Sequence, residues 1–243
     1  LRFSTATEML LTWASSQGWA SLVFSLGNLA LWLDADYSAS IIKAGPNVTQ
    51  WSDRSGNGRH ASASGGNNVT VAAAGRLRRS SLEFDNARLV LGATYTPPAD
   101  ATIYIVWTQF ASGAISHAIL NVHNVSSSGT GVYTDHDGTY VYFGFGGPSG
   151  NYSVSQTASP DIETPQIGVA QKDSGAVAFR LNGVNVGVVL SAGTLGNGAF
   201  NSVGSEGSYP SKHRVGEILV FEAVHDGPTI ARVEAYLAAK WIP

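Results

Sequence analysis

The segment from Ala30 to Ala61 reads ALWLDADYSASIIKAGPNVTQWSDRSGNGRHA, and it decides how the rest of the chain is interpreted. Leu29 to Asp36 forms an apolar run that ends in an acidic turn. Trp51 to Gly58 forms a polar, glycine-rich loop that begins at an aromatic residue. An apolar strand followed by turn residues of this kind is typical of a β-sheet protein whose loops close the ends of the sheets.

Outward from this segment, short apolar and β-branched runs alternate with Gly, Pro, Asn and Asp turns. Runs of this length between regular turn signals indicate strands. Eleven such strands are more than one small sheet uses, so we expect an all-β, two-sheet antiparallel jelly-roll sandwich. The predicted strands are Leu29 to Leu33, Ser81 to Phe84, Arg88 to Leu91, Ala101 to Gln109, His117 to Val122, Gly131 to Thr134, Thr139 to Phe145, Gln166 to Lys172, Ala176 to Leu181, Val184 to Leu190 and Val215 to Phe221.

Two local patterns are more specific than the rest. Asn182-Gly183 separates two apolar runs, and both residues tolerate the positive φ that a two-residue hairpin turn requires, so we expect a hairpin there. Near the C-terminus the apolar period changes to that of a helix from Ile230 to Trp241, and Pro228 sits just before it, where its missing N–H costs nothing. We expect a short helix that docks on the sandwich through Ile230, Val233, Tyr236, Leu237 and Trp241.

Composition limits the classes of partner. The 243 residues fit one large β-sandwich domain, and a chain that is 44% hydrophobic and 13% charged, with 28 glycines, indicates a packed globule with many turns. A net charge of −3 gives no basic field for nucleic acid. The basic cluster from Arg76 to Arg79 is better interpreted as a solvated turn than as a phosphate site. No apolar run is long enough for membrane insertion.

The chain divides at residue 28. Residues 1–28 show no strand alternation and are expected to form an N-terminal arm or adaptor, while residues 29–243 form the sandwich domain. The absence of cysteine excludes disulfides and thiolate metal ligands and leaves the redox compartment open.

Four blocks of the chain, in this order and spacing, resemble LamG-like (concanavalin A-like) domains. They cover about Leu29 to Trp241, and residues 1–28 lie outside the resemblance. The blocks are Leu31-Trp-Leu-Asp34; Trp51-Ser-Asp-Arg-Ser-Gly-Asn-Gly58 with Ala61; Leu82-Glu-Phe-Asp85; and Gly216-Glu-Ile-Leu-Val-Phe221 leading to Arg232 through Trp241.

The resemblance implies a mostly non-catalytic domain of secreted bacterial proteins or bacteriophage virions. It leads us to expect a lectin-like binding or adhesion module on a virion or cell exterior that recognises surface glycan. The alternative is a structural bacteriophage virion protein, such as a capsid decoration or tail component, that assembles through the N-terminal arm. Expected partners are surface glycans or other virion and surface proteins, with homo-oligomerisation as a further option. No cofactor is required, and calcium is a candidate ligand.

Enzymatic alternatives fail on spacing. Glucanases of related fold carry Glu-x-Asp-x-x-Glu on one strand, whereas Glu83 and Asp85 have no third acid nearby. Val203-Gly-Ser-Glu-Gly207 approaches the Gly-x-Ser-x-Gly pattern of hydrolases but lacks its strand-turn-helix setting. We therefore predict that the chain is not an enzyme.

The densest polar and aromatic cluster predicts where sugar would bind. Tyrosine rings can stack on a sugar while Asp and His side chains bond to its hydroxyls. The two aspartates could also supply part of a calcium site, but we favour a hairpin turn at Asp137-Gly138. The candidate carbohydrate-binding residues are Tyr133, Asp135, His136, Asp137, Tyr140 and Tyr142.

The loop from Trp51 to His60 has two interpretations. Asp53 and Asn57 could hold an ion or a sugar, or Asp53 and Ser55 could cap the turn while Trp51 fills the end of the sandwich. We favour the structural interpretation, under which mutation of Asp53 affects stability before it affects binding.

Overall fold

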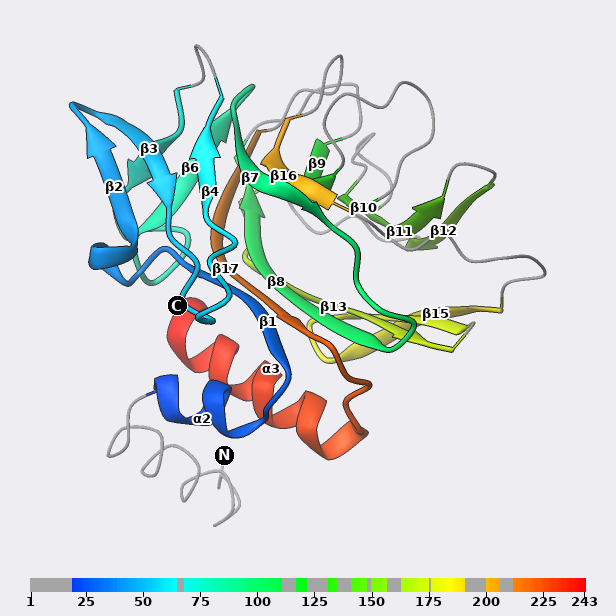
Figure 1. Ribbon diagram of the computed structural model, residues 1–243. Helices are drawn as coiled ribbons and strands as arrows, with labels where there is room; N and C mark the ends of the chain where they lie inside the picture. The colour runs from blue at the N-terminus through cyan, green and yellow to red at the C-terminus, as the bar shows by residue number, and fades with distance from the viewer. Residues whose placement is uncertain are drawn as a thin grey trace, which may run out of the picture.

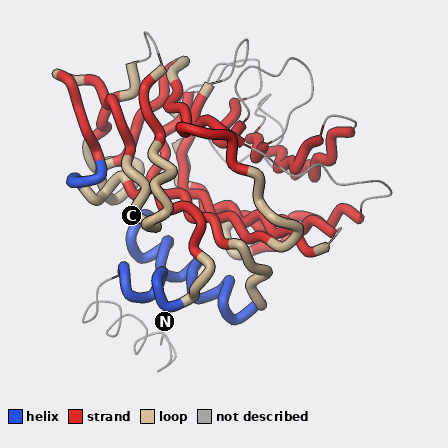
Figure 2. The backbone as a smooth tube through the Cα atoms, in the orientation of Figure 1, coloured by secondary structure: helices blue, strands red, loops and turns tan. Residues whose placement is uncertain are grey.

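The computed structural model describes residues 19–64, 68–110, 117–121, 131–134, 141–147, 150–156, 163–174, 176–190, 200–205 and 212–243. These residues form a β-sandwich with helices on one outer face (Figures 1 and 2). Every pairing between its named strands is antiparallel. The predicted fold class, an all-β sandwich with a C-terminal helix, is confirmed.

All eleven predicted strands are present, with ends that differ by a few residues and with Val122, Thr139 and Tyr140 outside the described residues. They are β1 Leu29–Asp34, β6 Ser81–Asp85, β7 Arg88–Tyr95, β8 Ala101–Gln109, β9 His117–Asn121, β10 Gly131–Thr134, β11 Val141–Gly147, β13 Gln166–Asp173, β14 Ala176–Leu181, β15 Val184–Leu190 and β17 Lys212–Phe221.

The structure adds six strands that the sequence did not predict, because most are short or carry polar residues that hide the alternation. They are β2 Ile41–Ala44, β3 Asn47–Trp51, β4 Ala61–Ala63, β5 Thr70–Ala72, β12 Gly150–Gln156 and β16 Phe200–Gly204. A single turn of 3₁₀ helix, η1 Ser38–Ser40, precedes β2.

One continuous hydrogen-bonded order builds both layers. It runs β10-β9-β16-β7-β4-β3-β5-β6-β17-β8-β13-β14-β15, with β1 beside β17 and β2 beside β3, while β11 and β12 pair separately. The order curls so that β7 and β16 lie opposite β8 and β13 (Figure 1). The core contains fully buried rings such as Trp51, Phe84 and Phe200, each of which stabilises the fold by about 1.5–3 kcal/mol.

Helix α3, Gly227–Trp241, confirms the predicted C-terminal helix. It begins a few residues earlier than predicted because the Asp226 side chain accepts a hydrogen bond from the Thr229 backbone N–H at 2.8 Å, and Pro228 fits the first turn. The five apolar side chains of the predicted stripe are all buried: Ile230, Val233, Tyr236, Leu237 and Trp241.

A glycine in β17 lets this helix approach the sheet closely. A Cβ atom at Gly216 would lie 2.8–2.9 Å from ring atoms of Trp241. The middle of α3 is held by Arg180 of β14, whose Nη2 lies 2.9 Å from the Glu234 carboxylate. The helix therefore covers the outer face of the sheet that contains β17 and β14 (Figure 1).

The predicted hairpin is confirmed. Strands β14 and β15 pair directly across the turn, with Leu181 opposite Val184. Asn182 and Gly183 adopt φ of 49° and 82°, as the turn requires. The Asn182 Oδ1 atom also accepts a hydrogen bond from the Ile167 backbone N–H at 2.8 Å, which fixes the turn to β13.

Part of the predicted N-terminal arm packs on the sandwich. Helix α2, Trp19–Ser25, places Leu22 and Val23 in the hydrophobic core. The backbone carbonyl of Asn28 accepts a hydrogen bond from the Glu222 N–H at 2.8 Å. The boundary at residue 28 stays a prediction, and any truncation that tests the arm should therefore stop before α2.

Candidate functional site

The predicted sugar-binding cluster lies largely outside the described residues. Residues 135–140, which include Asp135, His136, Asp137 and Tyr140, are not described, and of β10 and β11, which carry Tyr133 and Tyr142, only the backbone is described. This set of carbohydrate-binding residues stays a prediction.

The glycine-rich loop is held by the carboxylate of Asp53, which is 8% exposed. Its Oδ1 atom accepts the backbone N–H groups of Trp32 at 3.0 Å and Ser55 at 2.9 Å. Its Oδ2 atom accepts the Arg59 N–H at 3.0 Å and the Ser55 hydroxyl at 2.8 Å. The Asn57 side chain donates to the backbone carbonyls of β1, to that of Leu29 at 2.9 Å. These bonds support the structural interpretation of the loop, since Asp53 and Asn57 are occupied within the protein.

Replacing Asp53 by asparagine is expected to lower the free energy of unfolding by about 2–3 kcal/mol, because an amide N–H₂ would face donors that now meet a charged acceptor. Urea unfolding measures this loss, and Asp173→Asn at an exposed aspartate is the matched control. Ligand affinity of the folded protein should stay unchanged. Unaltered stability with weakened binding would instead favour a binding role for Asp53.

The two acids of β6 are paired with bases of β17. The strand register places Glu83 opposite Arg214 and Asp85 opposite Lys212. Arg214 Nε donates to Glu83 at 2.7 Å, and Lys212 pairs with Asp85. Cross-strand ion pairs of this kind stabilise a sheet modestly, which explains the two acids without catalysis. Within the described part of the chain no three His, Asp or Glu side chains gather as metal ligands, so a calcium site stays a prediction from the sequence.

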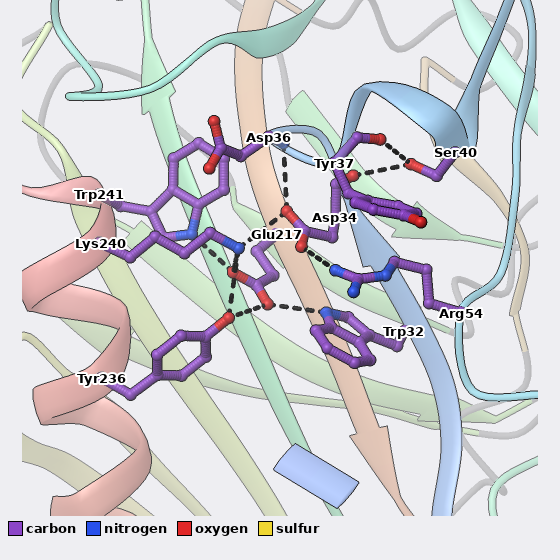
Figure 3. A network of polar contacts seen from close by, with 10 residues as sticks. All are labelled: Trp32, Asp34, Asp36, Tyr37, Ser40, Arg54, Glu217, Tyr236, Lys240 and Trp241. Carbon is purple, nitrogen blue, oxygen red and sulfur yellow. Dashed lines mark hydrogen bonds and ion pairs between the residues drawn. The ribbon is translucent and has the colours of Figure 1, made fainter. Parts of the chain in front are cut away.

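A buried ion network joins α3 to the sheet (Figure 3). Asp34 of β1 lies opposite Glu217 of β17, so both side chains point to the helix. The Lys240 ammonium lies between them, 2.8 Å from Asp34 Oδ1 and 2.9 Å from Glu217 Oε2. All three residues are at most 5% exposed. A substrate cannot reach them, so the network stabilises the fold.

Glu217 is fully hydrogen-bonded. Besides Lys240, its carboxylate accepts the indole N–H groups of Trp32 at 2.8 Å and Trp241 at 2.7 Å, and the Tyr236 hydroxyl at 2.6 Å. Burial raises the pKa of Glu217, against the effect of the Lys240 charge. Burial by itself would lower the pKa of Lys240, but the two carboxylates outweigh it and raise that pKa.

The network reaches the surface through Arg54, whose guanidinium pairs with the carboxylate of Asp34 and lies against Tyr37. Tyr37 and its neighbour Asp36 are exposed. Sequence reasoning assigned no role to Tyr37, although an aromatic residue directly after an acidic turn was a usable signal. We call Asp36, Tyr37 and Arg54 the Tyr37 platform, in which Asp36 and Tyr37 are exposed and the Arg54 side chain is 19% exposed.

No protein-family model matches the chain, and no curated protein matches it. Solved structures do resemble it in fold. Domain 4 of AbnA, a GH43 extracellular arabinanase from Geobacillus stearothermophilus, in complex with arabinotriose, matches at 14% identity and a TM-score of 0.62 over 86% of this chain and 98% of that domain.

Two further structures match part of a longer chain. Trypanosoma rangeli sialidase in complex with sialic acid matches at 14% identity and a TM-score of 0.61 over 96% of this chain and 39% of the sialidase. The binding domain of Paraclostridial Mosquitocidal Protein 1 matches at 11% identity and a TM-score of 0.61 over 87% of this chain and 52% of that chain. The chain spans well under half the length of the sialidases.

These likenesses show a shared β-sandwich fold, and membership of the LamG-like family and the structural virion role stay predictions from the sequence. In the described part of the chain no helix is long and apolar enough to cross a bilayer.

Proposed function

We propose that this chain is a non-catalytic glycan-binding module that acts outside the cell. The observation that carries the proposal is its match with domain 4 of the arabinanase over 86% of one chain and 98% of the other, since that domain was solved with an arabinotriose. The match covers most of this chain and nearly all of that domain.

The state of the acids supports a non-catalytic role. A glycosidase needs two carboxyl groups that reach the sugar from either side of the scissile bond. Asp34 and Glu217 are buried under α3, while Glu83 and Asp85 are paired with bases. None of these four acids is free to act as a general acid or a nucleophile.

A glycan array with the purified chain tests the proposal, followed by calorimetric titration with any oligosaccharide that binds. We expect millimolar to micromolar affinity for at least one glycan class, with no reducing sugar released on prolonged incubation. Absence of binding to every glycan class would overturn the proposal, and release of reducing sugar would overturn its non-catalytic part.

A further inference from the structure

Four side chains near the end of β1 form a layered stack that reaches the surface at both ends. The rings of Phe24 and Trp32 meet edge to face with centroids 5.2 Å apart. The guanidinium carbon of Arg54 lies 3.9 Å from the centroid of a Trp32 ring and 4.0 Å from that of Tyr37 (Figure 3). Trp32 is buried, but Phe24 and Tyr37 are 52% and 48% exposed. Each end of the stack therefore presents an aromatic ring to solvent.

Arg54 holds the Tyr37 ring in place. Its Nη1 atom pairs with Asp34, and its backbone N–H donates to the Trp32 carbonyl at 2.8 Å. The described residues give its Nε and Nη2 atoms no hydrogen-bond partner, and its side chain is 19% exposed. Because this guanidinium is fixed by an ion pair and packs between two rings, the Tyr37 ring that it supports loses little conformational entropy when it binds a ligand.

The face of the Tyr37 ring that Arg54 leaves open can pack against a sugar ring. Because Arg54 covers one face of the Tyr37 ring, the opposite face is the one left to a ligand. The C–H groups of a sugar ring pack on such a face, since aromatic faces carry partial negative charge.

Local charge selects among sugars. The two cations of the network, Arg54 and Lys240, are matched by the carboxylates of Asp34 and Glu217. Asp36 then adds a negative charge at the surface. The site therefore has no excess positive charge to attract a uronic or sialic acid, and its exposed carboxylate repels one.

We infer that the Tyr37 platform binds a neutral sugar unit, with Tyr37 as the stacking ring, Arg54 holding that ring from behind and Asp36 disfavouring acidic sugars. This inference rests on the proposed function and names the site and the ligand class, in place of the predicted hairpin around Tyr140.

Titration calorimetry with the full chain tests the inference. The probes are arabinotriose and maltotriose as neutral sugars and trigalacturonic acid and sialyllactose as acidic ones, together with the best ligand from the array. Tyr37→Ala should weaken neutral-sugar binding by about tenfold or more. Ile42→Ala removes a side chain of nearly equal exposure, 49%, on β2 and should bind as the wild type does. Thermal melting confirms that both variants fold.

A second variant tests the charge argument. Asp36→Asn retains an acceptor but removes the charge, so it should bind an acidic sugar several-fold more tightly than the wild type, most clearly at low salt. Equal binding of acidic sugar by both proteins would overturn the assignment to neutral sugars, as would wild-type preference for the acidic probes.

The outcomes separate the two proposals. If the wild type binds a glycan and Tyr37→Ala binds it equally well, the inferred site is wrong and the proposed function stands. If Tyr140→Ala alone loses binding, the site moves to the predicted hairpin. If the wild type binds no glycan at all, both proposals fall.

Discussion

Replacing Lys240 by methionine is expected to lower the free energy of unfolding by about 3–5 kcal/mol, the usual cost of removing one partner from a buried ion pair. Methionine preserves most of the volume, so the loss comes from leaving Asp34 and Glu217 buried together without their cation. Urea unfolding measures the change. Lys43→Met makes the same chemical change at an exposed lysine and should stay within about 0.5 kcal/mol of the wild type.

A double-mutant cycle identifies the cause. If the ion pair is responsible, Lys240→Met combined with Glu217→Gln should cost less than the sum of the two single changes, with a coupling of about 0.5–3 kcal/mol. Additive losses would mean that Lys240 stabilises α3 by packing alone.

The stability of Lys240→Met should also depend on pH differently from that of the wild type. The folded state holds the Lys240 proton more tightly than the unfolded chain does, since its pKa is raised above 10.5. Its contribution to stability is therefore complete below that pH and is lost as the pH rises through the folded-state pKa. Above pH 10.5 the wild type should lose stability more steeply than Lys240→Met. Parallel alkaline profiles would contradict the raised pKa.

Replacing Gly204 by alanine is expected to cost about 2–5 kcal/mol, from an unfavourable backbone conformation together with overpacking. Gly204 ends β16 with φ of +101°, and a Cβ atom there would lie 2.4 Å from the Ala87 carbonyl oxygen and 2.6 Å from the Phe84 ring. The carbonyl belongs to the backbone, so it cannot move aside as a flexible side chain would.

Gly92→Ala is the matched control for this position. Gly92 lies in β7 without positive φ, and nothing stands within 4 Å of its Cβ site. Alanine there should leave stability unchanged or raise it by about 0.5–1 kcal/mol. If both variants unfold at the same urea concentration, the close contact at Gly204 has no energetic consequence.

The close contact at Gly204 also explains the motif that approaches the Gly-x-Ser-x-Gly pattern of hydrolases. In Val203-Gly-Ser-Glu-Gly207, Gly204 allows close contact with the backbone of Ala87. The serine that would be a nucleophile is only 8% exposed, and its backbone N–H donates to the Ala87 carbonyl at 2.9 Å. A glycine in a catalytic pattern and a glycine at a close contact look the same in the sequence.

The candidate site was less predictable than the fold. Tyr37 and Arg54 both lie in the segment from Ala30 to Ala61, but their contact depends on how the glycine-rich loop returns beside β1 through Asp53. Local pattern favoured the tyrosines near Asp137 instead, because clustering along the chain is visible in a sequence and exposure is not.

The sequence by itself determined eleven of the strands, the Asn182-Gly183 hairpin and the C-terminal helix, since each follows from hydrophobic period and turn chemistry over a few neighbouring residues. Tertiary structure alone decided which polar residues meet. Lys240 contacts Asp34 across 206 positions of the chain, and no pattern near either residue identifies the other as its partner. The same long-range packing buries Trp32 and leaves Tyr37 exposed, because burial depends on which surfaces α2, α3 and the glycine-rich loop cover.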